Sequence, residues 1–264
     1  MTDTQPAPQR HFKDARLGGA SFENVDLSGS RFHHVDLRGA DIRGVDLSGS
    51  SLKDVDLIDV RIDGDIDGLV VNGVDVGPMV EAELDRRQPG RVKMRPSDPA
   101  GFREAWDLLE QLWAGTVEKA RRLPPERLHE QVAGEWSFIE TLRHLAFATD
   151  AWVRRAIEGD PSPWHPLDLP WDQMPDTSGI PRDRDARPTL EEALALRQDR
   201  AATVRRIVDG LTDEQLGSDT RPVEGAGWPP PRSFPVRECL LTVLNEEWQH
   251  RLYAERDLDA LLAS

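Results

Sequence analysis

The sequence is short of the features that mark secreted and membrane-spanning proteins. It holds one cysteine, Cys239, among 264 residues, which excludes an intramolecular disulfide and fits a reducing compartment. It has no run of 18 apolar residues, and its opening residues, Met-Thr-Asp-Thr-Gln-Pro, lack the apolar stretch of a signal peptide. These absences predict a cytoplasmic protein.

Basic residues are scarce relative to acidic ones. The chain has 33 lysines and arginines against 48 aspartates and glutamates, a formal net charge of −15. A negative surface repels nucleic acid and anionic membranes, so we expect neither as a partner. A length of 264 residues leaves room for two modest domains, each with its own core.

A five-residue period runs through the first part of the chain. Large apolar residues recur at every fifth position from Phe12 to Ile62, and a small or β-branched residue precedes each of them by two positions from Leu17 onward. An α-helix would spread this period around its circumference, and a flat strand would send alternate members to opposite faces. A coil that turns a corner every five residues buries both series, because each unit points the same two side chains inward.

Units such as Val25-Asp26-Leu27 and Ala40-Asp41-Ile42 resemble the pentapeptide-repeat family over about residues 11–66. The resemblance implies a right-handed quadrilateral β-helix of nearly three coils. Residues 69–76 are predicted to form one or two closing strands that cap its edge, which gives a first domain over residues 11–76.

Some members of the pentapeptide-repeat family mimic DNA and bind gyrase. Residues 11–66 contain eleven acidic and seven basic side chains, so their surface is only mildly negative. We therefore favour a structural or docking module over a DNA mimic.

The rest of the chain is typical of a helical bundle. Residues 77–97 are predicted to form a short helix and a linker, and residues 98–264 the bundle. Ser137 and Thr189 each open a capping box, and Ser233 is the predicted N-cap of the last helix. Four helices of this length suit a four-helix bundle, and they are expected over about residues 102–120, 137–157, 189–208 and 233–258.

The connection over residues 158–188, hereafter the lid segment, is long for a bundle. It is rich in proline and contains Trp164 and His165, so we expect an ordered lid over the helices. Trp164 and His165 are candidate contacts for a substrate or cofactor. The same prolines equally suit a rigid surface loop.

Three side chains on two of the predicted helices could bind a metal. Glu246 and His250 stand four residues apart, so they project from one helix face. His144 lies off the apolar stripe of its own helix, next to the small residues Thr141 and Ala148. Spacing alone favours the simpler interpretation, in which His144 is a satisfied or exposed histidine and the pair is solvated.

A sequence motif supports the metal-binding interpretation. Trp136-Ser-x-x-Glu-Thr-Leu-x-His144-Leu stands about a hundred residues before Glu246-x-x-x-His250. This arrangement resembles the DinB-like four-helix metalloproteins over roughly residues 98–260. The variant with Glu-x-x-x-His is similar to the mycothiol-dependent maleylpyruvate isomerases. The resemblance implies that His144, Glu246 and His250 are the three protein ligands of a divalent metal. The resemblance does not extend to the second domain of those isomerases, so the substrate stays open.

Two imidazoles and one carboxylate leave a tetrahedral ion with an open position, as in catalytic zinc sites. Zinc is the first choice, and nickel or iron(II) would accept the same ligands. The resemblance favours a low-molecular-weight thiol, bound as a thiolate, that attacks a small electrophile: a thiol S-transferase or isomerase. Tyr253 and Asp257 follow on the ligand face and could orient the groups that surround the metal ligands, or could simply pack or be exposed.

Two other functions remain open. The chain could be a non-catalytic, metal-containing binding or scaffold protein that docks a partner through its repeats, or a metal-dependent hydrolase. A homodimer or another protein partner could also use an apolar stripe on the last helix, which otherwise belongs to the bundle core: Leu240, Leu244, Trp248 and Leu252.

Overall fold

The computed structural model describes residues 11–22 and 25–264. Contacts within the chain divide it after Asp63 into two units, which are described separately. The sequence places the boundary near residue 76 instead. The difference arises because the residues expected to close the repeats form a small hairpin that clusters with the helical unit.

The first unit turns a corner every five residues, as its sequence period predicts. Backbone hydrogen bonds of 3.0 Å close a turn every ten residues, the first from the amide of Ala20 to the carbonyl of Leu17. Between residues 14 and 59, left-handed backbone conformations recur at five-residue steps wherever the unit is described. They fall on Asp14, Gly19, Gly29, His34, Gly39, Gly44, Gly49, Asp54 and Asp59.

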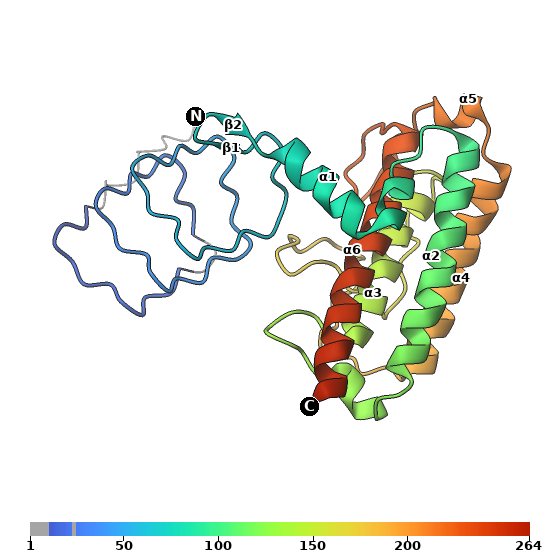
Figure 1. Ribbon diagram of the computed structural model, residues 1–264. Helices are drawn as coiled ribbons and strands as arrows, with labels where there is room; N and C mark the ends of the chain where they lie inside the picture. Colours follow the sequence, from blue (N-terminus) through green and yellow to red (C-terminus); the bar gives the residue numbers. More distant parts are fainter. Residues whose placement is uncertain (1–10, 23–24) are drawn as a thin grey trace. The chain divides into compact units, whose positions relative to one another are not determined.

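The right-handed β-helix expected for this unit is not shown. No strand forms within residues 11–22 and 25–63, which run as an open winding chain (Figure 1). The large apolar side chains of the period stay in contact with solvent; Leu17, for example, is 47% exposed and Leu52 is 67% exposed. The turns have the predicted spacing, but within the described part of the unit no strand forms and neither apolar series is buried.

The second unit begins with a two-stranded antiparallel hairpin. Strands β1 (Val70–Val71) and β2 (Val74–Asp75) flank Asn72 and Gly73, both of which have positive φ angles, as tight hairpin turns require. Helix α1 (Gly77–Arg87) follows, within the range predicted for a short helix and with a proline in its first turn. A 3-10 helix, Pro89–Met94, leads into the bundle.

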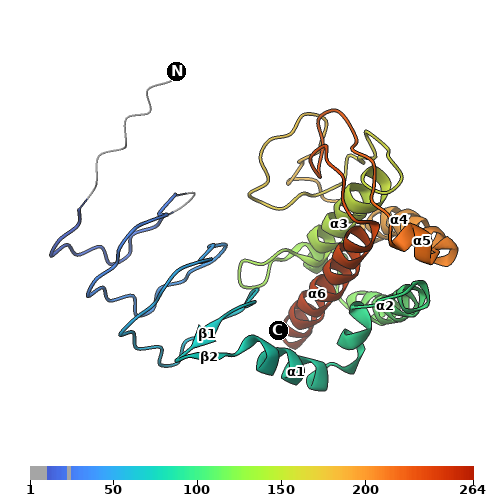
Figure 2. The same ribbon diagram turned by 90° about the horizontal axis from the view of Figure 1, so that it is seen from above.

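Four long helices occupy the positions that the sequence predicts, and they lie side by side (Figures 1 and 2). They are α2 (Pro99–Ala120), α3 (Phe138–Thr149), α4 (Leu190–Gly210) and α6 (Val236–Ala263). The expected count of four is nevertheless wrong, because the described residues contain further helices. These are α1, α5 (Asp213–Leu216), the 3-10 helices Pro89–Met94 and Pro125–His129, and a π-helix (Asp150–Arg155) that continues α3.

Helix ends show where local signals decide the structure. Both predicted capping boxes form, at Ser137 and at Thr189. The last helix is different: its N-cap is Pro235, and the Ser233 hydroxyl donates instead to the carbonyl of Thr220. An antiparallel bridge between Asp219 and Pro235 keeps this stretch extended, so the helix starts later than predicted.

The apolar stripe of α6 belongs to the bundle core. Leu240, Leu244 and Trp248 are buried in one cluster with residues of α2 such as Phe102 and Trp106, and Leu252 packs partly buried against it. The stripe is therefore covered within the unit. No helix among the described residues is long and apolar enough to cross a membrane.

The lid segment is an ordered cover held by two buried arginines. Arg143 on α3 donates to the carbonyl oxygens of Leu167, Asp183 and Ala186. Arg155 on the π-helix donates to the carbonyl of Pro161 in the lid segment and to those of Val223 and Gly225 in the loop before α6. The guanidinium group suits this task, since it offers five donors in a fixed plane.

Candidate metal centre

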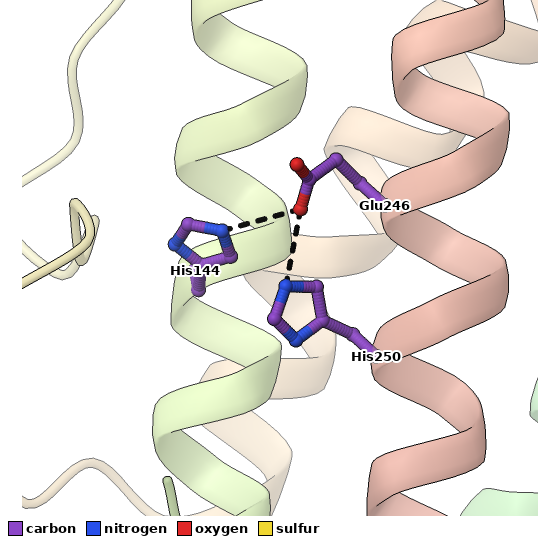
Figure 3. Close-up of side chains that lie close together, drawn as sticks. All are labelled: His144, Glu246 and His250. Atoms are coloured by element: carbon purple, nitrogen blue, oxygen red, sulfur yellow. Dashed lines mark hydrogen bonds and ion pairs between the residues drawn. The ribbon is translucent and has the colours of Figure 1, made fainter. Parts of the chain in front are cut away.

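Helices α3 and α6 bring together the three side chains that the sequence singles out. His144 projects from α3, and Glu246 and His250 project from successive turns of α6 (Figure 3). One oxygen, Oε2 of Glu246, lies 3.3 Å from Nε2 of His144 and 3.1 Å from Nε2 of His250. The possible ligand atoms all lie within 4.8 Å of one another, close enough to share one ion.

A backbone contact fixes the orientation of His144. Its Nδ1 atom lies 2.9 Å from the carbonyl oxygen of Leu169 in the lid segment. A carbonyl can only accept, so Nδ1 carries the hydrogen and the neutral ring presents a lone pair at Nε2. That lone pair then faces the Glu246 carboxylate. Two acceptors at 3.3 Å need either a further proton or a cation between them.

Glu246 is suited to be an anionic ligand. Burial by itself would raise the pKa of its carboxyl group. When a further proton rather than a cation lies between the groups, hydrogen bonds and charge interactions with His144 and His250 outweigh burial and hold that pKa well below its usual range. An ionised carboxylate with two imidazole nitrogens is a donor set that zinc, nickel and iron(II) accept. The residues present therefore fit a divalent metal.

Aromatic rings enclose the two imidazoles. The Trp136 ring lies 4.4 Å from the His144 ring and stacks on His250 at 5.6 Å, with 12° between the planes. Tyr253 meets His250 edge to face at 5.9 Å. Trp136 opens the sequence motif that contains His144, but sequence reasoning assigned it no role in the site. Its position just before the capping box that opens α3 was the available signal, but the spacing gave no hint of its contact with α6.

The other predicted site residues lie outside the three-residue cluster. Asp257 accepts hydrogen bonds from the adjacent Arg256 at 2.7 and 3.0 Å. Trp164 stacks on Phe147, one turn after His144 on α3, at 5.6 Å. The Nδ1 atom of His165 accepts from the amide of Leu167 at 3.2 Å, a contact within the lid segment itself.

The model of the DinB superfamily matches residues 108–254, which include all three candidate ligand residues, and that of the pentapeptide repeats matches eight copies over residues 11–49. The chain belongs to the DinB superfamily. This DinB protein is thus a fusion of a repeat region with a domain of a metal-binding superfamily, as the motifs indicate. Searches of curated proteins and of solved structures found no match.

A cavity of about 860 Å³ lies elsewhere in the DinB domain. It is lined by the end of the π-helix region, by the C-terminal end of α4 around Arg206 and Leu211, and by residues 218–224. None of the three candidate ligand residues lines it. The candidate metal centre and this cavity are therefore separate features.

Proposed function

We propose that this DinB protein binds one divalent metal ion through His144, Glu246 and His250 and uses it for thiol-dependent transfer or isomerisation of a small electrophile. The observation that carries the proposal is the position of Glu246 Oε2, 3.3 and 3.1 Å from two imidazole nitrogens. We take zinc as the metal, with nickel and iron(II) as alternatives.

Each residue has a distinct task in this scheme. His144 is held by the Leu169 carbonyl so that Nε2 points at the site, and Glu246 supplies the negative charge. His250 completes the set, with its ring braced between Trp136 and Tyr253. A bound divalent cation would lower the pKa of a thiol that reaches it and keep the sulfur in its nucleophilic form.

The cosubstrate is a low-molecular-weight thiol and the substrate a small molecule with an electrophilic carbon. In a transfer, the sulfur electron pair forms the new C–S bond, the leaving group departs with its own pair, and the thiol proton passes to solvent. In an isomerisation, the sulfur adds to a conjugated carbon, rotation follows about the former double bond, and the thiol leaves unchanged. Trp164 and His165 on the lid segment are proposed substrate contacts.

Conjugation of a chromogenic nitroaryl halide by mycothiol, glutathione or bacillithiol tests this function. The zinc-loaded protein should turn over with at least one thiol, and Glu246→Gln should abolish the turnover. The exposed Glu238, on the same helix, provides the control: Glu238→Gln should keep full activity. A zinc-loaded protein that is inactive with all three thiols would contradict the transferase assignment.

A second candidate is a non-catalytic binding or scaffold protein whose repeats dock a partner. It is favoured by the exposed apolar side chains of the repeat unit, among them Ile58, which is 79% exposed. This alternative expects stoichiometric zinc without thiol turnover and without hydrolysis of activated esters. Hydrolysis without any thiol would instead favour a metal-dependent hydrolase. Light scattering after size exclusion tests for a homodimer in either case.

A further inference from the structure

Two carboxyl groups meet in the interior of the DinB domain beneath the lid segment. Asp150 begins the π-helix after α3, Asp168 lies in the lid segment, and both residues are fully buried. Their side chains are within hydrogen-bonding reach of each other. Each has one buried oxygen, Oδ1, without a hydrogen-bond partner. Such orphaned buried oxygens are costly, and two in adjacent groups need a common explanation.

The other oxygen of each carboxyl group is well satisfied. Oδ2 of Asp150 accepts from Arg200 on α4 at 2.6 and 3.2 Å, and Oδ2 of Asp168 accepts from the amide of His165 at 2.8 Å. Oδ1 of Asp150 lies 3.5 Å from Nε of Arg154, too far for a good hydrogen bond. One proton between the two carboxyl groups would satisfy both orphaned oxygens at once.

The charges around the pair favour a single proton. The charged and titratable groups that face it from the packed elements are Arg143 from α3, Arg154 from the π-helix, Asp199 and Arg200 from α4, and His165 from the lid segment. Burial and the neighbouring Asp150 raise the pKa of Asp168 to about 8, and burial also raises the pKa of Asp150. Asp168 is thus the protonated partner at neutral pH and donates to Asp150, whose other oxygen accepts from Arg200.

The pair is connected to the metal centre through one peptide. Asp168 immediately precedes Leu169, whose carbonyl accepts from Nδ1 of His144 at 2.9 Å and whose amide donates to the carbonyl of Arg143 at 3.4 Å. A shift of Asp168 therefore moves the acceptor that orients His144. Hydrogen-bond partners of metal-ligating histidines commonly change metal affinity by about 10–100-fold when they are removed.

We propose that Asp150 and Asp168 share one proton and act as a latch that positions the Leu169 carbonyl against His144. Loss of the proton places two carboxylates in contact in the interior, so the lid segment loosens around Leu169 at alkaline pH. The effect on metal binding rests on the proposed metal centre, whereas the latch itself is a property of the metal-free protein.

Amide hydrogen exchange of the metal-free full chain tests the latch. After correction for the intrinsic pH dependence of exchange, protection of residues 165–170 should fall at least tenfold between pH 7 and pH 9.5, while that of α4 stays constant. Asp168→Asn, whose amide can donate to Asp150 as the protonated acid does, should keep its protection over the whole range. Asp176→Asn is the matched control, because that side chain is 94% exposed on the same segment; it should behave as wild type.

Zinc affinity, measured with a competing chelating dye at pH 7, tests the connection to His144. Asp168→Ala should weaken zinc binding at least tenfold, while Asp168→Asn stays within threefold of wild type. Unchanged protection in the wild type at pH 9.5, or lost protection in Asp168→Asn at pH 7, would overturn the latch. Equal zinc affinity in all variants would overturn its positioning role. A wild type that binds no zinc would refute the metal centre, and the exchange experiment would still decide the latch.

Discussion

Arg197 on α4 and Glu247 on α6 are joined by two hydrogen bonds, of 2.6 and 2.7 Å, between buried side chains. The guanidinium group also lies 5.5 Å from the ring of Trp113, which covers it on the α2 side. Glu247 directly follows the proposed ligand Glu246 in sequence. The ion pair therefore fixes the rotation of α6 at the turn that carries the proposed metal centre.

Removing one partner of this pair should lower the free energy of unfolding far more than removing both. Arg197→Met leaves the Glu247 carboxylate buried without a counter-charge, which typically costs about 3–5 kcal/mol. The double variant Arg197→Met with Glu247→Leu replaces the pair by apolar groups and should recover most of that loss. Urea unfolding gives both free energies. A single variant as stable as the wild type would show that the pair is not buried in solution.

Metal binding should depend on all three ligand residues. Purified wild-type protein should contain about one zinc ion per chain, and His144→Ala, Glu246→Gln and His250→Ala should each contain almost none. At a free zinc concentration 100 times the dissociation constant, the ion should stabilise the wild type by about 2.7 kcal/mol and leave the variants unchanged. Elemental analysis and thermal unfolding measure the two effects, with Glu238→Gln as the control.

Features encoded over a few residues could be predicted from the sequence. The capping boxes at Ser137 and Thr189 depend on side chains three residues apart, and both form. The four-residue spacing of Glu246 and His250 likewise fixes a shared helix face before any tertiary contact is known. The five-residue period correctly predicted the corners of the repeat unit.

Features that depend on distant contacts could not be predicted. Ser233 has the chemistry of an N-cap, but the bridge from Asp219 to Pro235 overrides it. The contact between the Leu169 carbonyl and His144 requires the path of the lid segment, which has no periodic signal. Burial of Asp150 and Asp168 together likewise depends on that path. The five-residue period also did not determine whether the repeats close into a β-helix.

The lid segment should open when its arginine clamp is removed. Arg143→Met deletes the donors to the carbonyls of Leu167, Asp183 and Ala186, and hydrogen bonds from a charged group are worth about 1.5–3 kcal/mol each. Limited proteolysis should therefore cut within residues 158–188 at least tenfold faster than in wild type. The exposed Arg122 supplies the control, Arg122→Met. Equal cleavage rates in both variants would show that other contacts hold the lid.

The single cysteine should be inert in the folded protein. Cys239 is fully buried, and burial raises the pKa of its thiol to about 12, so almost no reactive thiolate exists at pH 8. A disulfide-exchange reagent should label less than a tenth of the chains under native conditions and one thiol per chain in urea. Ser162→Cys, at an exposed position of the lid segment, should react at once. Rapid native labelling of the wild type would contradict the packing of this residue.

The stability of the protein should fall with rising pH more steeply in wild type than in Asp168→Asn. The pKa of Asp168 is about 8 in the folded state against an ordinary value of 3.8, so between these limits the folded chain holds a proton that the unfolded chain has released. Stability therefore decreases as pH rises through this window, by up to about 1.4 kcal/mol per pH unit for one proton, and levels off above it. Asparagine binds no proton, and the other titrating groups are common to both proteins. The free energy of unfolding, measured with urea at pH 5 and at pH 7.5, should thus fall more in the wild type than in Asp168→Asn. An equal fall in both proteins would mean that Asp168 is ionised in the folded protein.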